Sequence, residues 1–534
     1  MSSKLFEKLK LYKNYANDCI FFKYIFDQKD LNDENSKKSD DPTVFKPEYT
    51  HQIFGDEEII FGYKNLKVDY FLTPGSLDAY IGLNFKEKIS AQRFEGIEPD
   101  NVFEAFNNFG CSPGYTTNLN VFSEKMTADQ QFRPYGNKVS EYTRQLADDK
   151  VGTFEIYKVD STLPEFEDQK FIDYMLRVQT MLVYYIETSC FVDTEDPQWT
   201  YYLLYEKRKL SNSEYRYLTI GYVSLYNYYA FPDKTRSRIS QVMIFPLYER
   251  MGHGAELVES VYRDAIQNPN VADITAEDPS PEFIRIRDFI TTRMCLTLDS
   301  FKDKEKLKKG YSNEMAKEAL SKYKMPKLQS RRCYEILRLA AINPNKQDEL
   351  KDYRLDIKKR LYLPFIRKSK YARNGAEING ESGSDAKPAE AVSSKPKNGL
   401  ENRFGGGSGV TSNGFGSREI DTVGVTTIGF GNSNGGASKI APLSINGKVN
   451  TVNGNGKKMV SFSGKNTSLN TSNSTTDNSN QSDGDEDEPN AMGQGNLFVS
   501  EQERKQYLEE QFQEALNDYN RILKRLEHEN ISIN

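Results

Sequence analysis

The stretch that decides the fold covers residues 238–277 and reads RISQVMIFPLYERMGHGAELVESVYRDAIQNPNVADITAE. It begins with a short run of apolar and β-branched residues, 239–245, which is typical of a buried strand. A turn that contains Gly252 and Gly254 follows this run. Residues 255–267 then carry apolar side chains at helical spacing. The pattern therefore predicts a strand, a glycine turn and a helix in immediate succession.

A second strand completes the unit. Asn268 and Pro269 end the helix, and residues 271–275 form a short apolar run that is followed by the acidic pair Glu277 and Asp278. Strand, turn, helix and strand in this order predict a crossover connection between parallel strands. The glycine turn lies at the helix N-terminus, where free N–H groups and the positive end of the helix dipole favour a phosphate.

Composition limits the classes of protein that remain. The 534 residues include 71 Lys and Arg against 77 Asp and Glu, a formal charge of −6, which argues against a direct DNA-binding protein and permits a basic partner. The five cysteines are scattered, which indicates a reduced, intracellular protein. Only three histidines are present, so we expect no metal site. The sequence contains neither a secretory signal nor an apolar run that reaches the roughly 18 residues of a membrane span, so we expect no membrane partner.

The fold class that we expect is mixed α/β (α+β), with one sheet-based core. Residues 168–188 have helical apolar spacing, and the aromatic runs 199–205 and 217–229 flank a polar turn and predict a β-hairpin. Six segments are expected: a polar, partly helical segment 1–45 that ends in a loose connection; a strand-rich subdomain 46–140; the core 141–295; a helical subdomain 296–373; a low-complexity insert 374–497; and a final amphipathic helix within 498–534.

Two of these segments follow from simple physical arguments. Residues 374–497 are rich in Gly, Ser, Asn and Thr, and they bury too little apolar surface to offset the entropy of ordering, so we expect disorder. The final helix carries Leu508, Phe512, Tyr519 and Leu526 on one face, so we expect it to dock either on a partner or on the folded body.

Several motifs together resemble one family. QVMIFPLYERMGHGAELVE followed by DITAEDPS, with HQIFGDEE before them and RRCYEILRL after them, is similar to the type B histone acetyltransferase catalytic subunits of the GNAT superfamily of N-acetyltransferases. The resemblance covers roughly residues 45–372 and 500–528. It implies a GNAT core and an acyltransferase that moves acetyl from acetyl-CoA to lysines on the N-terminal tail of newly made histone H4. It also implies a WD40 histone-binding chaperone as partner, and residence in cytoplasm and nucleus.

The resemblance further implies a cofactor site. The family pattern at the phosphate turn is Gln or Arg, two residues, Gly, one residue, then Gly or Ala. This chain departs from it at Glu249, whose carboxylate we expect to weaken acetyl-CoA binding somewhat unless it turns to solvent or pairs with Arg250. A backbone N–H of the preceding strand is expected to donate to the thioester carbonyl. The expected acetyl-CoA contacts are Val242, Met243, Ile244, Glu249, Arg250, Met251, Gly252, His253, Gly254, Ala255 and Ser280.

The catalytic residues that the resemblance implies are three carboxylates. Glu277 is the expected general base, because it follows a strand end where a carboxylate can face a cleft. Asp278 has two interpretations, helix N-cap or chemistry, and capping is slightly favoured; Ser280 either caps the next helix or touches the cofactor. Glu187 ends the predicted helix 168–188, where an acid opposes the helix dipole, so it is either a second catalytic carboxylate or a solvent-facing charge.

The expected histone-contacting residues are Asp56, Glu57, Glu58, Tyr226, Asn227 and Tyr228. Acidic side chains suit a basic tail, although period-two tyrosines are also common in sheet packing. No cysteine lies in the core stretch, which favours direct transfer over an acetyl-cysteine intermediate. Two other functions remain open: a catalytically weak histone-binding escort, and a small-molecule amine acetyltransferase on the same superfold.

Overall fold

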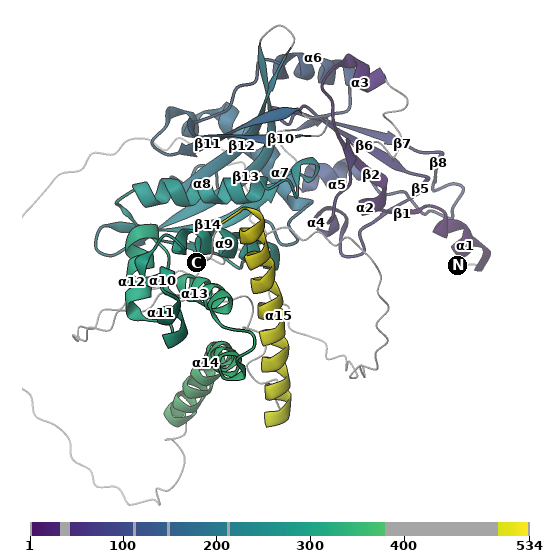
Figure 1. Ribbon diagram of the computed structural model, residues 1–534. Helices are drawn as coiled ribbons and strands as arrows, with labels where there is room; N and C mark the ends of the chain where they lie inside the picture. Colours follow the sequence, from purple (N-terminus) through teal and green to yellow (C-terminus); the bar gives the residue numbers. More distant parts are fainter. Residues whose placement is uncertain are drawn as a thin grey trace, which may run out of the picture. The chain divides into compact units, whose positions relative to one another are not determined.

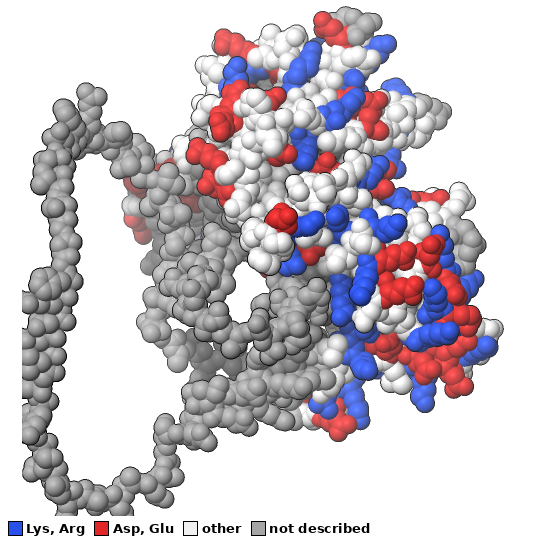
Figure 2. Space-filling view, turned by 90° about the vertical axis from the view of Figure 1, so that its left-hand side faces the viewer, with Lys and Arg blue, Asp and Glu red and all other residues white. Residues whose placement is uncertain are grey.

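The computed structural model describes residues 3–32, 43–109, 114–146, 150–210, 214–379 and 500–531. The chain divides into two compact units, Met1–Ala372 with Lys457–Asn534, and Arg373–Gly456. The first unit contains the two large sheets and two small strand pairs of the described residues, with the helices that surround them (Figure 1). On the face that Figure 2 displays, basic and acidic side chains are interspersed, in keeping with the nearly balanced counts of the two charges.

A six-stranded mixed sheet is the centre of the first unit, with strand order β10-β11-β12-β13-β14-β15. Its strands are β10 (Asn137–Gln145), β11 (Val151–Asp160), β12 (Trp199–Lys209), β13 (Tyr215–Ala230), β14 (Lys234–Ile244) and β15 (Val271–Ala276). Neighbours are antiparallel except β14 and β15, which are parallel. This confirms the mixed α/β class and the hairpin predicted for β12 and β13.

The predicted crossover unit is also confirmed. The 3-10 turn η4 (Pro246–Tyr248) and helix α8 (His253–Gln267) connect β14 to β15, and α8 lies against the sheet (Figure 1). The helix buries Leu257, Val258 and Val261 completely, as its apolar spacing predicts. Burying three such side chains contributes several kcal/mol, at about 1.5–3 kcal/mol each, which fixes the helix on the sheet.

A second sheet of five strands, in the order β3-β2-β6-β7-β9, forms the N-terminal part. Its strands are β2 (Ile20–Tyr24), β3 (Val44–Phe45), β6 (Lys67–Leu72), β7 (Ala79–Asn84) and β9 (Tyr115–Thr116). Two small pairs flank it, β1 (Lys13–Tyr15) with β4 (Ile59–Phe61), and β5 (Tyr63–Lys64) with β8 (Glu87–Lys88). The helices of this part are α1 (Ser3–Lys10), α2 (Ala16–Cys19), α3 (Gln28–Asn32), α4 (His51–Phe54), α5 (Val102–Asn108) and α6 (Leu119–Asp129).

The prediction for residues 1–45 was wrong in one respect. The segment does begin with a short helix, but it continues into β1, α2 and β2 instead of a loose connection. Strand β2 is internal to its sheet, between β3 and β6, and Phe22 is fully buried against Tyr70 and Tyr184. These aromatic partners come from distant parts of the chain, so the local sequence does not reveal them.

The helices of the core and C-terminal part are η3 (Pro164–Glu167), α7 (Gln169–Val183), α9 (Pro281–Cys295), α10 (Asp299–Lys302), α11 (Lys304–Lys309), α12 (Asn313–Tyr323), α13 (Lys327–Ala341), α14 (Gln347–Asn379) and α15 (Glu501–His528). Helix α15 packs on α9 and α13, so its apolar face docks on the folded body (Figure 1). The predicted disordered insert lies outside the described residues from 380 onward, and α14 extends helix into its first residues.

None of the described helices combines the length and apolar composition that a membrane crossing requires. The described residues also contain no group of three or more His, Cys, Asp or Glu side chains that could hold a metal ion.

Candidate active site

Strand β14 has an open edge over its last residues. It pairs with β13 up to Ile244, whereas its ladder with β15 ends at the pair Ile239 and Ala276. Within the described residues, no strand covers the β15 side of residues 240–244. The two strands therefore part beyond Ile239 and leave a split in the sheet.

Main-chain donors face this split. The N–H of Gln241 donates to Ser224 Oγ on β13, at 3.1 Å. Because backbone groups alternate in direction along a strand, the N–H groups of Val242 and Ile244 point to the opposite, open edge, and that of Met243 points back to β13. Of the three residues expected at the thioester, Val242 and Ile244 thus have the suitable main-chain orientation. The side chains of all three are buried, as core residues are.

The glycine turn lies at the N-terminus of α8. Gly252 has φ +85°, a left-handed backbone that favours glycine, and it is the residue immediately before the helix. The N–H groups of His253, Gly254 and Ala255 open the helix, where no preceding carbonyl of the same helix is available to them. Arg250 is exposed and also has positive φ, at +59°. This geometry fits a pyrophosphate, which accepts backbone hydrogen bonds and complements the helix dipole.

A guanidinium that the sequence did not suggest lies beside this turn. Arg144 on β10 donates to Glu256 Oε1 at 3.1 Å and to the carbonyl oxygen of Gly252 at 3.5 Å. A Cβ atom added at Gly252 would lie 3.1 Å from Arg144 Nη2, so the guanidinium is in direct contact with the turn. The buried Nε of Arg144 has no hydrogen-bond partner among the described residues. No local motif marks Arg144, because only the pairing of the sheet brings β10 to α8.

His253 is the first residue of α8, and its side chain is buried away from the turn. Tyr142 Oη and His253 Nδ1 are 2.8 Å apart, and the imidazole packs on Phe154 with ring centroids 4.4 Å apart. Burial, together with the nearby Arg144 charge, lowers the pKa of His253 to about 4. The imidazole is therefore neutral near pH 7, and His253 offers the turn a backbone N–H without a positive charge.

Glu277 lies at the point where the strands part. Its N–H donates to the carbonyl oxygen of Ile239 at 3.0 Å, and the residue is half-buried. Two side chains are within its electrostatic reach: burial raises the pKa of Cys190 and of Tyr228, and the Glu277 charge raises both further. Gln241 Nε2 donates a hydrogen bond to the carbonyl oxygen of Cys190 at 2.9 Å. This bond fixes the loop that carries Cys190 against β14.

Cys190 lies outside the core stretch, yet the fold brings it to Glu277. Although part of the residue is exposed, desolvation raises the pKa of its thiol, which disfavours the thiolate that a covalent intermediate would need. Its position therefore does not alter the expectation of direct transfer.

The interpretation of Asp278 as a helix cap was wrong. Ser280 is the N-cap of α9, and its Oγ accepts the N–H of Phe283 at 3.3 Å. Asp278 is exposed and has φ +39°, which turns the chain between β15 and α9. Ser280 thus has the capping role that the sequence allowed, and the Asp278 carboxylate remains available to the site.

Glu187 does not end a helix, because α7 stops at Val183 and not at residue 188. It is exposed in the following turn, where its carbonyl accepts Gln52 Nε2 at 3.4 Å. Burial raises the pKa of Tyr49, and the charges of Glu187, Glu282 and Glu58 raise it further. Glu187 therefore belongs to an acidic group around the Tyr49 phenol.

The three acidic residues that we expect to contact the histone differ in their exposure to solvent. Asp56 and Glu57 are exposed, whereas Glu58 points inward. Glu58 Oε1 accepts the N–H groups of Thr50 and His51, at 2.7 and 3.1 Å, and its Oε2 accepts Asn17 Nδ2 at 2.8 Å. The Glu58 carboxylate thus holds the start of α4 in place.

In the segment Tyr226, Asn227 and Tyr228, some side chains are engaged within the fold and one is open to solvent. The Asn227 side chain accepts a hydrogen bond from Ser237 Oγ at 2.8 Å and donates one to Thr200 Oγ1 at 3.0 Å. Tyr226 and Tyr228 share one face of β13, with ring centroids 4.7 Å apart, and Tyr226 also packs on Trp199. Tyr228 is 38% exposed and lies under the Arg238 guanidinium, so it is the member that presents an open surface.

Comparison with known proteins gives a consistent result. The family model described as "Histone acetyl transferase HAT1 N-terminus" matches residues 12–187, and the one described as "Histone acetyltransferase type B catalytic subunit, C-terminal" matches residues 287–339. The histone acetyltransferase type B catalytic subunit of Mus musculus is 38% identical over 365 residues, 68% of this chain and 84% of its own length. The chain belongs to the family of type B histone acetyltransferase catalytic subunits.

Other relatives agree. The Homo sapiens protein of the same name is 38% identical over 68% of this chain and 83% of its own length, and one from Dictyostelium discoideum is 30% identical over 68% and 79%. A solved aminoglycoside acetyltransferase in complex with sisomicin covers 23% of this chain and 76% of its own, at 14% identity and a TM-score of 0.17. As a type B histone acetyltransferase, the chain is an acyltransferase that uses acetyl-CoA, and the open β14 edge and the Gly252 turn fit that cofactor.

Proposed function

We propose that this chain acetylates lysines on the N-terminal tail of histone H4 by direct attack, with Glu277 as general base. The split between β14 and β15, with Glu277 at its origin and main-chain donors on one side, is the observation that supports this assignment. Bound acetyl-CoA would supply the acetyl group as an activated thioester. The lysine nitrogen bonds to the acetyl carbon, the carbon–sulfur bond breaks, and coenzyme A leaves as its thiol; of the two protons that the lysine nitrogen loses, one ends on this thiol and the other passes to solvent.

Different residues of the chain accept the proton, stabilise the developing negative charge and attract the lysine. Lysine is protonated near pH 7, with a pKa of about 10.4, so its ammonium must lose a proton before the nitrogen attacks. The Glu277 carboxylate accepts that proton, directly or through one water. The N–H groups of Val242 and Ile244 stabilise negative charge that develops on a carbonyl oxygen at the open edge. Asp278 and Glu187 supply further negative charge near the incoming cation.

The phosphates of the cofactor are assigned to the start of α8. The N–H groups of His253, Gly254 and Ala255 donate to them, and the Arg144 guanidinium supplies the positive charge that neutral His253 lacks. Glu249 and Arg250 flank this turn, and Met251 continues its backbone. Ser280 is removed from direct cofactor contact in this proposal, because its Oγ caps α9.

The histone tail is assigned to the acidic side of the site. Asp56 and Glu57 present carboxylates to a basic peptide, and the exposed face of Tyr228 contacts its chain.

We also propose, on the family resemblance alone, a WD40 histone-binding chaperone as partner and residence in cytoplasm and nucleus. Copurification of a WD40 protein with the tagged chain tests the first of these.

Mass spectrometry of intact histones after incubation with the purified protein and acetyl-CoA tests the substrate. We expect acetyl mass increments on full-length H4 and none on H4 that lacks its N-terminal tail. Faster acetylation of a free polyamine than of an H4-tail peptide would contradict the proposal and would favour a small-molecule acetyltransferase. Binding of H4 without any acetyl transfer would instead favour a histone escort.

A further inference from the structure

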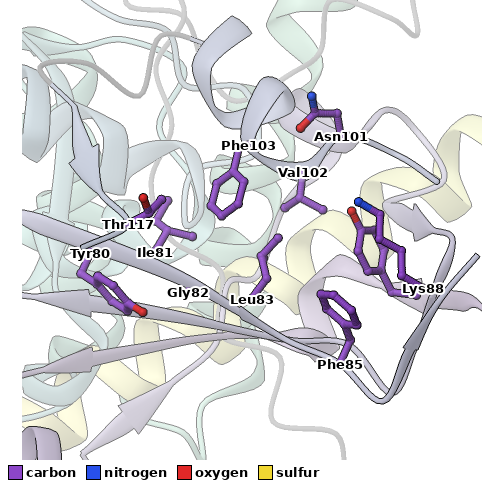
Figure 3. Close-up of a pocket in the computed structure, with 11 residues that line it drawn as sticks. Tyr80, Ile81, Gly82, Leu83, Phe85, Lys88, Asn101, Val102, Phe103 and Thr117 are labelled. Atoms are coloured by element: carbon purple, nitrogen blue, oxygen red, sulfur yellow. The ribbon is translucent and has the colours of Figure 1, made fainter. Parts of the chain in front are cut away.

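A pocket of about 370 Å³ lies in the N-terminal sheet region, between strand β7 and helix α5. Figure 3 shows Ile81 and Leu83 on its strand side, with Val102 and Phe103 facing them from the helix. Its volume falls within the range of about 300–1,000 Å³ that is usual for ligand sites. None of the residues assigned to acetyl transfer lines it, so the function proposed above leaves it unexplained.

The pocket follows the edge of a strand. Four consecutive residues of β7, Tyr80 to Leu83, all line it. Because side chains alternate between the two faces of a sheet, four consecutive residues share a pocket only when it runs along the strand edge. Strand β9 covers that edge at Ala79 and Tyr80 alone, and β6 pairs with the opposite edge along the whole strand. Among the described residues, no strand pairs with the outer edge of residues 81–84.

Gly82 keeps this edge accessible. A Cβ atom at Gly82 would lie 2.7 Å from Tyr80 Oη, closer than real contacts permit, so a side chain here would displace the phenol. With glycine in place, the Tyr80 ring lies against the strand and the backbone remains open to an approaching chain. An unpaired strand edge with outward N–H and C=O groups is a template for an added strand.

One cation defines the charge of the pocket. Among the described residues that line it, Lys88 is the only charged one, and its Nζ lies 5.2 Å from the centroid of the Tyr63 ring. Nearby carboxylates are engaged elsewhere, since Glu87 pairs with Arg93 at 3.3 Å and Asp100 accepts the Phe61 N–H at 2.6 Å. Lys88 and the 43% exposed Phe85 lie together at one end, as Figure 3 shows.

We propose that this pocket binds an extended peptide of another protein, which adds as a strand to the outer edge of residues 81–84. One apolar side chain of the peptide enters between Leu83 and Phe103, and a carboxylate next to it meets Lys88. The occupant is thus an acidic peptide with an apolar anchor, opposite in charge to a histone tail.

Fluorescence anisotropy of dye-labelled peptides tests the proposal on the full-length protein. The probe has a central phenylalanine, flanking valines and threonines, and glutamate at both ends. Its matched control has lysine in place of glutamate, and a third peptide carries N-methyl groups on alternate backbone nitrogens. We expect the acidic peptide to bind at least about tenfold tighter than the basic one, and N-methylation to abolish binding because it removes the strand hydrogen bonds.

Two protein variants locate the site. Lys88→Glu should weaken binding of the acidic peptide about tenfold or more, whereas Lys86→Glu, two residues earlier in the chain but outside the pocket lining, should change the dissociation constant less than about twofold. Both lysines are exposed, so both variants should keep the wild-type melting temperature and H4 acetylation rate. Equal binding of acidic and basic peptides, unchanged binding of the N-methylated peptide, or no binding at about 1 mM would overturn the proposal.

Discussion

The N–H of Glu277 donates to the carbonyl oxygen of Ile239 at 3.0 Å, and beyond this bond β14 and β15 separate. The bond fixes the backbone of Glu277 at the origin of the split, beside the last residues of β14. A general base must be held within reach of the reacting amine, and a strand end provides that rigidity.

Arg144→Ala should weaken acetyl-CoA binding by about 10- to 150-fold, because the variant loses a charge-assisted contact to phosphate worth about 1.5–3 kcal/mol. Acetyl-pantetheine lacks the phosphates, so its affinity should not change. Isothermal calorimetry with both ligands measures the difference. Glu256→Gln is the control, since it breaks the ion pair with Arg144 but keeps the guanidinium, and it should not weaken binding. Equal losses for the two ligands would show that Arg144 acts only on the fold.

Acidification should destabilise the protein through His253. The pKa of this buried side chain is about 4 in the folded state against 6.5 ordinarily. Between these values the unfolded chain binds more protons, so the free energy of unfolding falls as pH decreases from about 6.5 to 4, by about 3 kcal/mol from this residue. Chemical denaturation across this range should therefore show a steeper loss for the wild type than for His253→Gln. Parallel curves for the wild type and His253→Gln would contradict the prediction.

Charge reversal at Asp56 and Glu57 should weaken binding of the histone tail without lowering the stability of the fold. Asp56→Lys with Glu57→Lys should raise KM for an H4-tail peptide several-fold and leave kcat and the melting temperature unchanged, since both side chains are exposed. Glu58→Gln should instead lower the melting temperature, because it weakens the bonds that hold Thr50 and His51. Steady-state kinetics and thermal melts of the three proteins decide between these effects. An unchanged KM in the double variant would remove this segment from the histone site.

Helix α15 should contribute to stability through one buried network. Tyr519 Oη donates to Glu335 Oε2 and Arg360 Nε donates to Glu335 Oε1, each at 2.8 Å. Burial alone would raise the pKa of Glu335, but the Arg360 charge and these hydrogen bonds hold it below its usual range. Tyr519→Phe should therefore lower the free energy of unfolding by about 1–3 kcal/mol.

The same helix offers a control for that measurement. Glu501 and Lys505 form an exposed ion pair, so Lys505→Ala should leave the free energy of unfolding close to the wild-type value. Urea denaturation followed by circular dichroism measures both variants. Equal stability of Tyr519→Phe and the wild type would mean that α15 is held by its apolar face alone.

The crossover unit could be predicted because its evidence is local. Strand, glycine turn and helix differ in apolar spacing within one short stretch, and the structure has them where the pattern places them. The end of α7 could not be predicted in this way. Tyr184, Tyr185 and Ile186 are at most 1% exposed, so the apolar pattern continues past the last helical residue, Val183.

The residues of the site that could not be predicted from the sequence are those that the pairing of distant strands brings together. Arg144 meets Gly252 across more than a hundred residues, and Cys190 reaches Glu277 through a loop held by Gln241. Strand β2 was missed for the same reason, since its partner β6 lies far along the chain. Spacing shows which residues share a helix or strand, but not which strands lie side by side.

The role of Glu277 is tested most directly by single-turnover acetylation of an H4-tail peptide by Glu277→Gln, with acetyl-CoA affinity measured on the same protein. Glutamine keeps the size and hydrogen-bonding shape of the side chain but does not accept the proton. We expect the rate to fall by about 10²–10⁴ while the dissociation constant of acetyl-CoA stays within about twofold of the wild type. A wild-type rate in the variant would contradict the assignment of Glu277 as the base.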